Sequence, residues 1–400
     1  MSDRRSIALF LTPVLPLPLG SGRALRAWDW LAELNQTHQV HVLVANEEGF
    51  TPRNRDYPAA GVHHVKTTRA PGSRLGRMLK MLAPPCCLLS RRGVADWQHL
   101  TPELEAELSS FRLADGAVTR IIVFRFYLHD LAQALSKRWP QARMELDMDD
   151  LESRTRWSVA ASLARMGRYL EALRWMGSGA QYAALERFMP GPYISAWLAA
   201  GVDRAGLRTR LAAKVGVRPN RISMPPVREN PFRAPATALR LMFVGTLSYA
   251  PNEEAVLDLV RLHLPVLARR LNRPCSLCVV GRHASARLLA ALDQRPQIEF
   301  IPDADCLDDL YEAADVVVVP LRAGGGTKLK TLEAFAHTKP VVSTAHGVRG
   351  LGVTAGEHYL AAETAAEFAD AIALLAREPQ RAERIARAGH ALCKQRYVRP

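Results

Sequence analysis

The chain has 400 residues, of which 48% are hydrophobic and 23% charged, a composition typical of a folded globular protein with room for two domains. Its 53 Lys and Arg against 39 Asp and Glu give a net charge of +14, which favours anionic partners such as phosphate-bearing substrates or an anionic membrane. No recognition-helix, zinc-finger or RNA-binding motif accompanies this charge, so nucleic acid is not an expected partner.

The chain shows no run of about 18 uncharged apolar residues, so no membrane-spanning helix is expected. The first apolar run, residues 7–11, is short and is followed by three prolines, which predicts a buried strand and a loop rather than an export signal. We therefore expect a cytoplasmic protein. Residues 73–92 mix basic side chains with Leu and Met and have two interpretations: a peripheral contact with the inner face of an anionic membrane, or a loop and helix packed on the N-terminal domain.

Strand and helix patterns alternate along the whole chain, which predicts parallel sheets covered by helices. The first half shows an amphipathic helix over 23–34, helical sequence over 157–189, and buried strands at 7–11, 40–45 and 121–124. Four prolines, at 225, 226, 231 and 235, then mark a linker. The second half shows strands at 240–245, 276–281, 315–320 and 340–344.

These patterns predict an N-terminal domain over 1–232, a C-terminal domain over 233–385, and a closing helix over 386–400 that returns to the first domain. With two α/β halves joined by a linker, the cleft between the domains is the expected ligand site.

The segment 315–337 holds the densest chemistry. An apolar strand leads into three glycines, Gly324 to Gly326, and then into a helix that Thr327 is expected to cap. Glycines let the backbone approach a ligand, and free N–H groups at a helix start favour an anion such as a diphosphate. The spacing is not that of a Walker P-loop. Lys330 and Glu333, three residues apart on this helix, suit a phosphate and sugar hydroxyls, or else form a surface ion pair.

The stretch from Gly324 to Thr344, continuing to Gly350-Leu351, resembles the donor-site signature of glycosyltransferase family 4. Residues 243–252, 279–282 and 298–303 resemble other segments of that family, in the same order. The Pro-Asn after Tyr249 resembles the same segment in the branch of the family that builds bacterial surface polysaccharides. The resemblance covers about residues 240–395 well and the first half loosely. It implies the α/β GT-B fold, two Rossmann-like doubly wound domains facing a central cleft.

The resemblance also implies roles for individual residues. Glu333 would bind the donor ribose, and Lys330 would hold the diphosphate together with the backbone of the loop Gly324, Gly325, Gly326 and Thr327. The remaining donor-site residues that it implies are Gly22, Gly245, Thr246, Arg282 and Pro302. Two of these residues have a second interpretation. The loop that contains Gly22 is alternatively a simple turn, and Arg282 is alternatively an ordinary surface arginine.

In the first half, Arg125 and His129 follow a predicted strand, where the family makes acceptor and sugar contacts, so both are candidate catalytic residues. His129 has the alternative of a structural histidine. The carboxylates over 147–152 suit a magnesium ion, helix capping or acceptor contact, and we favour the last two because GT-B enzymes generally work without a metal. No metal and no cofactor are therefore expected.

Two features depart from the family pattern. The family's Glu-x7-Glu pair has Gly325 in place of its first carboxylate, and the loop 246–252 lacks the usual Arg and Lys. The expected function is retaining transfer of a sugar from a UDP- or GDP-sugar to a glycan, lipid-linked or small-molecule acceptor, with Lys330 stabilising the departing diphosphate. The alternatives are a non-catalytic nucleotide-sugar-binding protein and a nucleotide-sugar epimerase.

Overall fold

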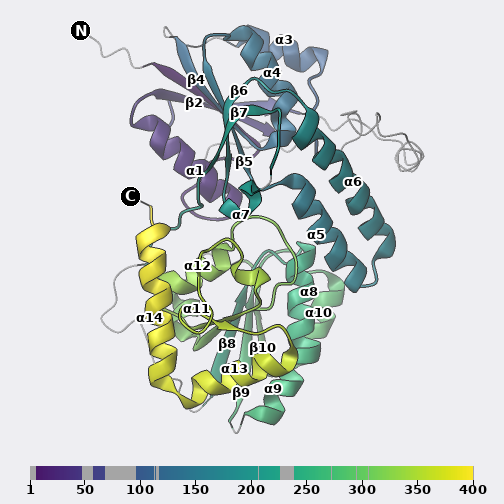
Figure 1. Ribbon diagram of the computed structural model, residues 1–400, viewed down its shortest axis with the longest axis vertical. Coiled ribbons are helices and arrows are strands. Elements are labelled where there is room, and N and C mark those ends of the chain that lie inside the picture. Colours follow the sequence, from purple (N-terminus) through teal and green to yellow (C-terminus); the bar gives the residue numbers. More distant parts are fainter. Residues whose placement is uncertain are drawn as a thin grey trace. The chain divides into compact units, whose positions relative to one another are not determined.

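The computed structural model describes residues 6–46, 57–67, 96–111, 113, 117–205, 207–225, 238–271, 273–293, 295–304 and 306–399. The chain divides into two compact units (Figure 1). Unit 1 comprises Met1–Trp157 and Arg174–Asn220, and unit 2 comprises Ser158–Leu173 and Arg221–Pro400. The predicted boundary at 232 lies outside the described residues. The short segment 158–173, predicted in the N-terminal domain, belongs to unit 2.

Unit 1 is built on a seven-stranded parallel sheet with the order β3-β2-β1-β4-β5-β6-β7. Its strands are β1 (Ile7–Thr12), β2 (Gln39–Asn46), β3 (Gly61–Lys66), β4 (Val118–Phe124), β5 (Arg143–Asp149), β6 (Tyr193–Leu198) and β7 (Ala212–Val217). The helices described in this half of the chain are α1 (Gly22–Asn35), α3 (Pro102–Ser110), η3 (Phe126–Leu128), α4 (His129–Arg138), α5 (Glu152–Arg165), α6 (Tyr169–Phe188) and α7 (Gly201–Arg204).

Both faces of this sheet are covered, which is why its central strand is continuously apolar. All six residues of β1 are buried. Because side chains alternate along a strand, Ile7, Leu9 and Leu11 enter one core with α3, α4 and α6. Ala8 and Phe10 enter the other core with α1.

Unit 2 is built on a six-stranded parallel sheet with the order β10-β9-β8-β11-β12-β13. Its strands are β8 (Leu239–Val244), β9 (Cys275–Val280), β10 (Ile298–Ile301), β11 (Val316–Val319), β12 (Val341–Ser343) and β13 (Leu360–Ala361). Its helices are α8 (Ala250–Asp258), η4 (Leu259–His263), α9 (Leu264–Arg270), α10 (Ala286–Asp293), α11 (Asp308–Ala313), α12 (Leu329–Ala336), η5 (His346–Val348), α13 (Ala365–Arg377) and α14 (Pro379–Arg396).

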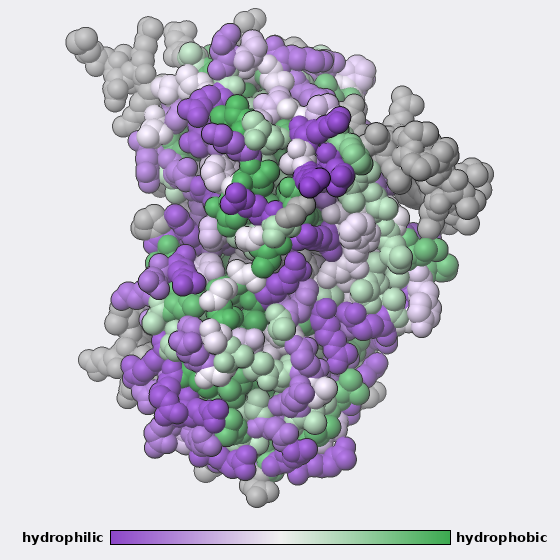
Figure 2. Space-filling model, in the orientation of Figure 1, coloured by the Kyte–Doolittle hydropathy of each residue, from purple (hydrophilic) through white to green (hydrophobic). Residues whose placement is uncertain are grey.

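The last helix, α14, starts at Pro379, earlier than the predicted closing helix 386–400, and belongs to unit 2. Ala382, Ile385 and Leu392 on its inner side enter the core of that unit. Its outer side is hydrophilic, as Figure 2 shows for the helix drawn in yellow in Figure 1. After the helix, the Tyr397 hydroxyl donates to the Leu351 carbonyl at 3.0 Å.

Each sheet has the Rossmann strand order 3-2-1-4-5-6, with one further strand in unit 1. The predicted class, α/β with two Rossmann-like doubly wound domains, is confirmed. Strand order reverses between β1 and β4 in unit 1, and between β8 and β11 in unit 2. Ligands of such sheets bind beyond the carboxyl ends of the strands at these points. Among the described residues, no helix is long and apolar enough to cross a membrane. Residues 73–92 lie outside the described part.

Candidate functional site

The glycine loop of unit 2 leads from the carboxyl end of β11 to α12, at the point where strand order reverses. Gly324 and Gly326 have φ of 117° and 68°. Residues with a Cβ rarely adopt this left-handed region, so the loop conformation requires glycine at both positions. The helix begins one residue later than predicted, with Lys328 rather than Thr327 at the cap position and no side-chain capping bond. The expectation that Thr327 caps α12 is therefore wrong.

Two N–H groups of the glycine loop already have hydroxyl partners. The Gly324 N–H donates to Ser158 Oγ at 2.6 Å, and the Gly325 N–H donates to the Tyr249 hydroxyl oxygen at 3.1 Å. Ser158 comes from α5 and Tyr249 from the loop after β8. A diphosphate that used the Gly325 N–H would have to displace Tyr249.

The carbonyl groups of the same loop face Lys328, which is only 6% exposed. Its Nζ donates to the Gly324 and Gly325 carbonyls at 3.0 and 3.4 Å. His346 Nε2 lies 2.9 Å from the Gly324 carbonyl oxygen. Burial, with the charge of Lys328 beside it, lowers the pKa of His346 to about 4. The imidazole is therefore neutral near pH 7 and donates through Nε2.

Lys330 projects from the first turn of α12 to the end of β8. Its Nζ lies 4.2 Å from the centroid of the Phe243 ring and donates to Asn252 Oδ1 at 2.7 Å. A Cβ placed on Gly245 would lie 2.9 Å from this Nζ, so the missing side chain makes room for the ammonium group. Burial, with the positive charge of Lys328 nearby, lowers the pKa of Lys330 to about 7.

Glu333 lies one turn further along α12 and has a different partner. The Tyr311 hydroxyl donates to Glu333 Oε2 at 3.3 Å. Tyr311 is fully buried and stacks on His337, with ring centroids 4.4 Å apart. Burial raises the pKa of Glu333 to about 7, against the hydrogen bond from Tyr311 and the charge of Lys330. Lys330 and Glu333 form no ion pair with each other in the described structure. The alternative interpretation, a surface ion pair between these two residues, therefore does not hold there.

The neighbouring loops bring the ends of β8 and β9 into close contact. A Cβ on Gly281 would lie 1.9 Å from the Gly245 carbonyl oxygen, so this approach requires glycine. Arg282, which follows, forms an exposed ion pair with Asp303. Pro302, in the loop after β10, is exposed. The charge of Arg282 is thus directed to a carboxylate on the neighbouring loop.

The structure therefore gathers most predicted donor-site residues at one edge of the unit 2 sheet. The residues at this edge are Gly245, Thr246, Gly324, Gly325, Gly326, Thr327, Lys330 and Glu333, with Arg282 and Pro302 on the next loops. Sequence reasoning missed the side chains that hold them: Ser158, Asn252, Tyr311, Lys328 and His346. Asn252 was visible as part of a motif, but its bond to Lys330 spans 78 residues.

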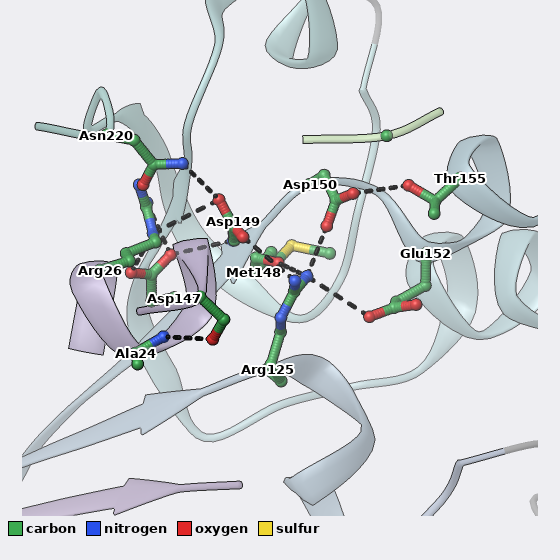
Figure 3. A network of polar contacts seen from close by, with 12 residues as sticks. Ala24, Arg26, Arg125, Asp147, Met148, Asp149, Asp150, Glu152, Thr155 and Asn220 are labelled. Carbon is green, nitrogen blue, oxygen red and sulfur yellow. Dashed lines mark hydrogen bonds and ion pairs between the residues drawn. The ribbon is translucent and has the colours of Figure 1, made fainter. Parts of the chain in front are cut away.

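In unit 1, the corresponding sheet edge carries a buried network of arginines and carboxylates (Figure 3). Arg26 donates through Nε and Nη2 to Asp147 at 2.7 and 2.8 Å, and through Nη1 to Asn220 Oδ1 at 2.6 Å. Asp149 lies 3.6 Å from Arg26 Nε and accepts from Asn220 Nδ2 at 3.2 Å. The nearby charges of Asp147 and Asp149 raise the pKa of Arg26 despite its burial. This network ties α1 to β5.

Arg125 is the second cation of the network and lies between Asp149, Asp150 and Glu152, as Figure 3 shows. It has a φ of 88°, an uncommon value for a residue with a side chain. Arg125 is only 5% exposed, and its guanidinium also donates to the Met148 carbonyl at 3.2 Å. The carboxylates of residues 147–152 thus pair with three buried arginines, Arg26, Arg125 and Arg156. Their contact with an acceptor stays a prediction.

His129 and Gly22 lie in different surroundings of unit 1. His129 is completely buried, and its Nδ1 lies 3.0 Å from the Tyr193 hydroxyl, among the rings of Trp97 and Phe126. This is the structural alternative considered for it. Gly22 opens α1 next to Ser21, whose hydroxyl accepts from the Ala24 N–H at 3.3 Å. Catalytic roles for Arg125 and His129 stay predictions, since neither side chain is open to solvent.

Within the described ranges, no group of three or more His, Cys, Asp or Glu is placed to hold a metal ion. Cys275 and Cys278 lie on β9 at positions that face opposite sides of the sheet, so one ion cannot bridge them. Burial raises the pKa of Cys278 to about 11, so its thiol is protonated near pH 7.

Comparison with known proteins agrees with this geometry. Residues 238–378, which lie in unit 2, match the family model described as "Glycosyl transferases group 1". No curated protein matches the sequence significantly.

Solved structures resemble the chain over nearly its full length. Sucrose-phosphate synthase from Thermosynechococcus elongatus is 15% identical with a TM-score of 0.65, the alignment covering 98% of this chain and 95% of that one. HepE from Anabaena, in complex with UDP and glucose, is 16% identical with a TM-score of 0.60 and the same coverage. Trehalose 6-phosphate synthase from Burkholderia multivorans is 13% identical with a TM-score of 0.61, covering 98% and 93%.

At these identities the likeness establishes the fold, which is the GT-B arrangement of two Rossmann-like domains. The family-model match in unit 2 adds sequence evidence over the segment that carries the glycine loop, Lys330 and Glu333. Together these findings support a transferase enzyme of the glycosyltransferase class.

Proposed function

We propose that the protein transfers a sugar from a nucleotide-sugar donor, UDP- or GDP-linked, to a glycan, lipid-linked or small-molecule acceptor, with retention at the anomeric carbon. One observation carries the proposal: the ammonium group of Lys330 lies at the switch point of unit 2 with a neutral amide, not a carboxylate, as its hydrogen-bond partner. A cation held in this way keeps its charge available for an anion.

The chemistry follows from where negative charge develops. When the sugar leaves, the nucleoside diphosphate gains charge on its bridging oxygen, and Lys330 with the start of α12 would stabilise it. Glu333 in its ionised form would accept hydrogen bonds from the donor ribose. A departing phosphate oxygen would take the proton of the acceptor hydroxyl, so the reaction needs no side-chain nucleophile.

The assignments of the donor base and of the family branch are based on similarity to known proteins. HepE was solved with UDP and with UDP-glucose, which supports a UDP-sugar donor. The match at 238–378 and the Tyr249-Ala-Pro-Asn252 motif support a family 4-like enzyme of the surface-polysaccharide type. The net charge of +14 supports a cytoplasmic enzyme in peripheral contact with an anionic membrane, where a lipid-linked acceptor is reached.

A second candidate, binding of a nucleotide sugar without transfer, has one observation in its favour. The N–H groups of Gly324 and Gly325 are engaged by Ser158 and Tyr249, and Gly325 stands where the family often has a carboxylate. Donor binding that is followed by neither transfer nor hydrolysis would support this candidate.

The first test is thermal stabilisation by a panel of UDP-, GDP-, ADP- and TDP-sugars. A ligand that binds the native state raises the melting temperature by mass action. We expect a shift with one donor class, lost in Glu333→Ala, and loss of turnover in Lys330→Ala. Glu299→Gln, on an exposed pair with Arg240, serves as the control. Turnover that persists unchanged in Lys330→Ala would refute the assignment.

A further inference from the structure

The ammonium group of Lys330 depends on one residue for its direction. It reaches across from α12 to the end of β8, a path lined by the Phe243 ring and by the bare backbone of Gly245. Neither contact gives the ammonium group a hydrogen-bond partner in the described structure: the ring face has no acceptor atom, and the approach to Gly245 is to the place of its missing side chain. The bond to Asn252 Oδ1, at 2.7 Å, supplies that direction.

Asn252 is itself held at its other end. Its Nδ2 donates to the Thr246 carbonyl at 2.8 Å, and the side chain is nearly buried at 7% exposure. A carbonyl only accepts and an ammonium group only donates, so the amide has one orientation that satisfies both. Of the common side chains of this size, aspartate lacks the donor and leucine lacks both groups.

The neutrality of this partner matters as much as its geometry. In the described residues, no carboxylate lies within ion-pair distance of Lys330 Nζ. The acidic residues that follow Asn252 are engaged elsewhere: Glu253 with Ser285 and Arg168, Glu254 with Ser162 and Arg165. The charge of Lys330 therefore remains uncompensated by an ion pair.

We propose that Asn252 is a positioning residue of the donor site, which aims the Lys330 ammonium group over Gly245 and leaves its charge free for the donor diphosphate. This inference rests on the proposed function for the identity of the anion. It also accounts for the missing Arg and Lys of the loop 246–252: the loop contributes an amide that orients a cation on α12 instead of a cation of its own.

The inference predicts opposite effects of two substitutions on the Lys330 ammonium group. The charged groups that act on it are Lys328, which lowers its pKa, and Glu333, which raises it, while burial lowers it most. Asn252→Leu removes an acceptor that favours the charged form, so the pKa of Lys330 should fall further. Asn252→Asp adds a negative charge, so that pKa should rise.

The test is competitive acetylation of the full-length protein with acetic anhydride, read by peptide mass spectrometry from about pH 5 to about pH 10, which reports the pKa of Lys330 directly. We expect the midpoint to fall by about one unit in Asn252→Leu and to rise by about one unit in Asn252→Asp. Asp258→Asn, on the same helix and paired with Arg322 at 3.4 Å, should leave it unchanged. Equal midpoints in all four proteins would overturn the inference, and an unfolded variant is recognised by a midpoint near that of free lysine.

Calorimetric binding of UDP and GDP at pH 6 separates this inference from the proposed function. We expect about tenfold weaker binding in Asn252→Leu, and weaker binding still in Asn252→Asp because the carboxylate neutralises the cation. If the wild-type protein binds neither nucleotide, the proposed function fails, while the acetylation result still decides whether Asn252 controls the pKa of Lys330. If the wild type binds and Asn252→Leu binds equally well, the positioning role fails alone.

Discussion

Tyr311→Phe should weaken donor binding near pH 7 and leave it almost unchanged near pH 9. The substitution removes only the hydroxyl that donates to Glu333 at 3.3 Å, while the ring keeps its stacking on His337. A hydrogen bond to a charged group contributes about 1.5 kcal/mol, and a pKa unit corresponds to about 1.4 kcal/mol. Losing it should raise the pKa of Glu333 by about one unit above its value of about 7.

The effect on binding follows from the ionised fraction of Glu333. With a pKa of about 7, about half of the carboxyl groups are ionised at pH 7, and with a pKa of about 8 about one tenth are. Donor affinity at pH 7 should therefore fall about fivefold, whereas at pH 9 both proteins are almost fully ionised. Because the charge of Glu333 also raises the pKa of Lys330, the ratio of the two affinities reports the change in ionisation of Glu333 together with its effect on Lys330.

Titration calorimetry with the donor found in the thermal panel, at both pH values, measures this ratio. Tyr397→Phe is the matched control, because it removes a buried hydroxyl bond to a backbone carbonyl in the same unit without touching Glu333. A ratio that is the same at pH 7 and pH 9 would refute the reasoning. A loss of donor affinity equal to that of Tyr397→Phe would show that reduced protein stability, not the ionisation of Glu333, causes the weaker binding.

Three further predictions concern stability and packing. Burial raises the pKa of Glu186 to about 7 from 4.5, so the stability linked to its proton is full below pH 4.5 and is lost as the pH rises through 7. Glu186→Gln should therefore raise the free energy of unfolding by about 3 kcal/mol at pH 8, measured by urea unfolding, and should not raise it at pH 4. Asp147→Asn should cost about 3 kcal/mol by removing the carboxylate that accepts two hydrogen bonds from the buried guanidinium of Arg26, which leaves only the more distant Asp149 as its charge partner. A loss below about 1 kcal/mol in urea unfolding would contradict this. Gly281→Ala should abolish donor binding, because the new Cβ would lie 1.9 Å from the Gly245 carbonyl oxygen, whereas Gly201→Ala, with open space around it, should bind normally by calorimetry.

The fold class was predictable because the central strands of both sheets, such as β1 and β11, are short apolar runs between helical patterns. Strands β3 (GVHHVK) and β5 (RMELDMD) of unit 1 were not predicted, because their polar and charged residues hide the apolar pattern. The assignment of residues 158–173 was not. Arg165 and Arg168 look like a solvated helix face in the sequence, and their partners, Glu254 and Glu253, lie 89 and 85 residues away. Helical periodicity gives the face that is buried but not the sheet that buries it.

The candidate site divides in the same way. Lys330 and Glu333 were predictable because they lie in a local motif with a glycine loop and a helix start. Asn252 and Tyr311 act through bonds that span 78 and 22 residues, which spacing alone does not show. The burial of Arg125 was hidden for a similar reason, since a basic residue after a strand looks the same whether it faces a ligand or a buried carboxylate.

The placement of residues 158–173 in unit 2 limits how the gene for such a protein can recombine. A crossover in the proline-rich linker, the usual place to exchange whole domains, would separate Arg165 and Arg168 from the α8 carboxylates with which they pair. It would also bring a foreign side chain to the Gly324 N–H that Ser158 now occupies. An exchange of the C-terminal half that keeps these contacts therefore has to include residues 158–173 as a second piece.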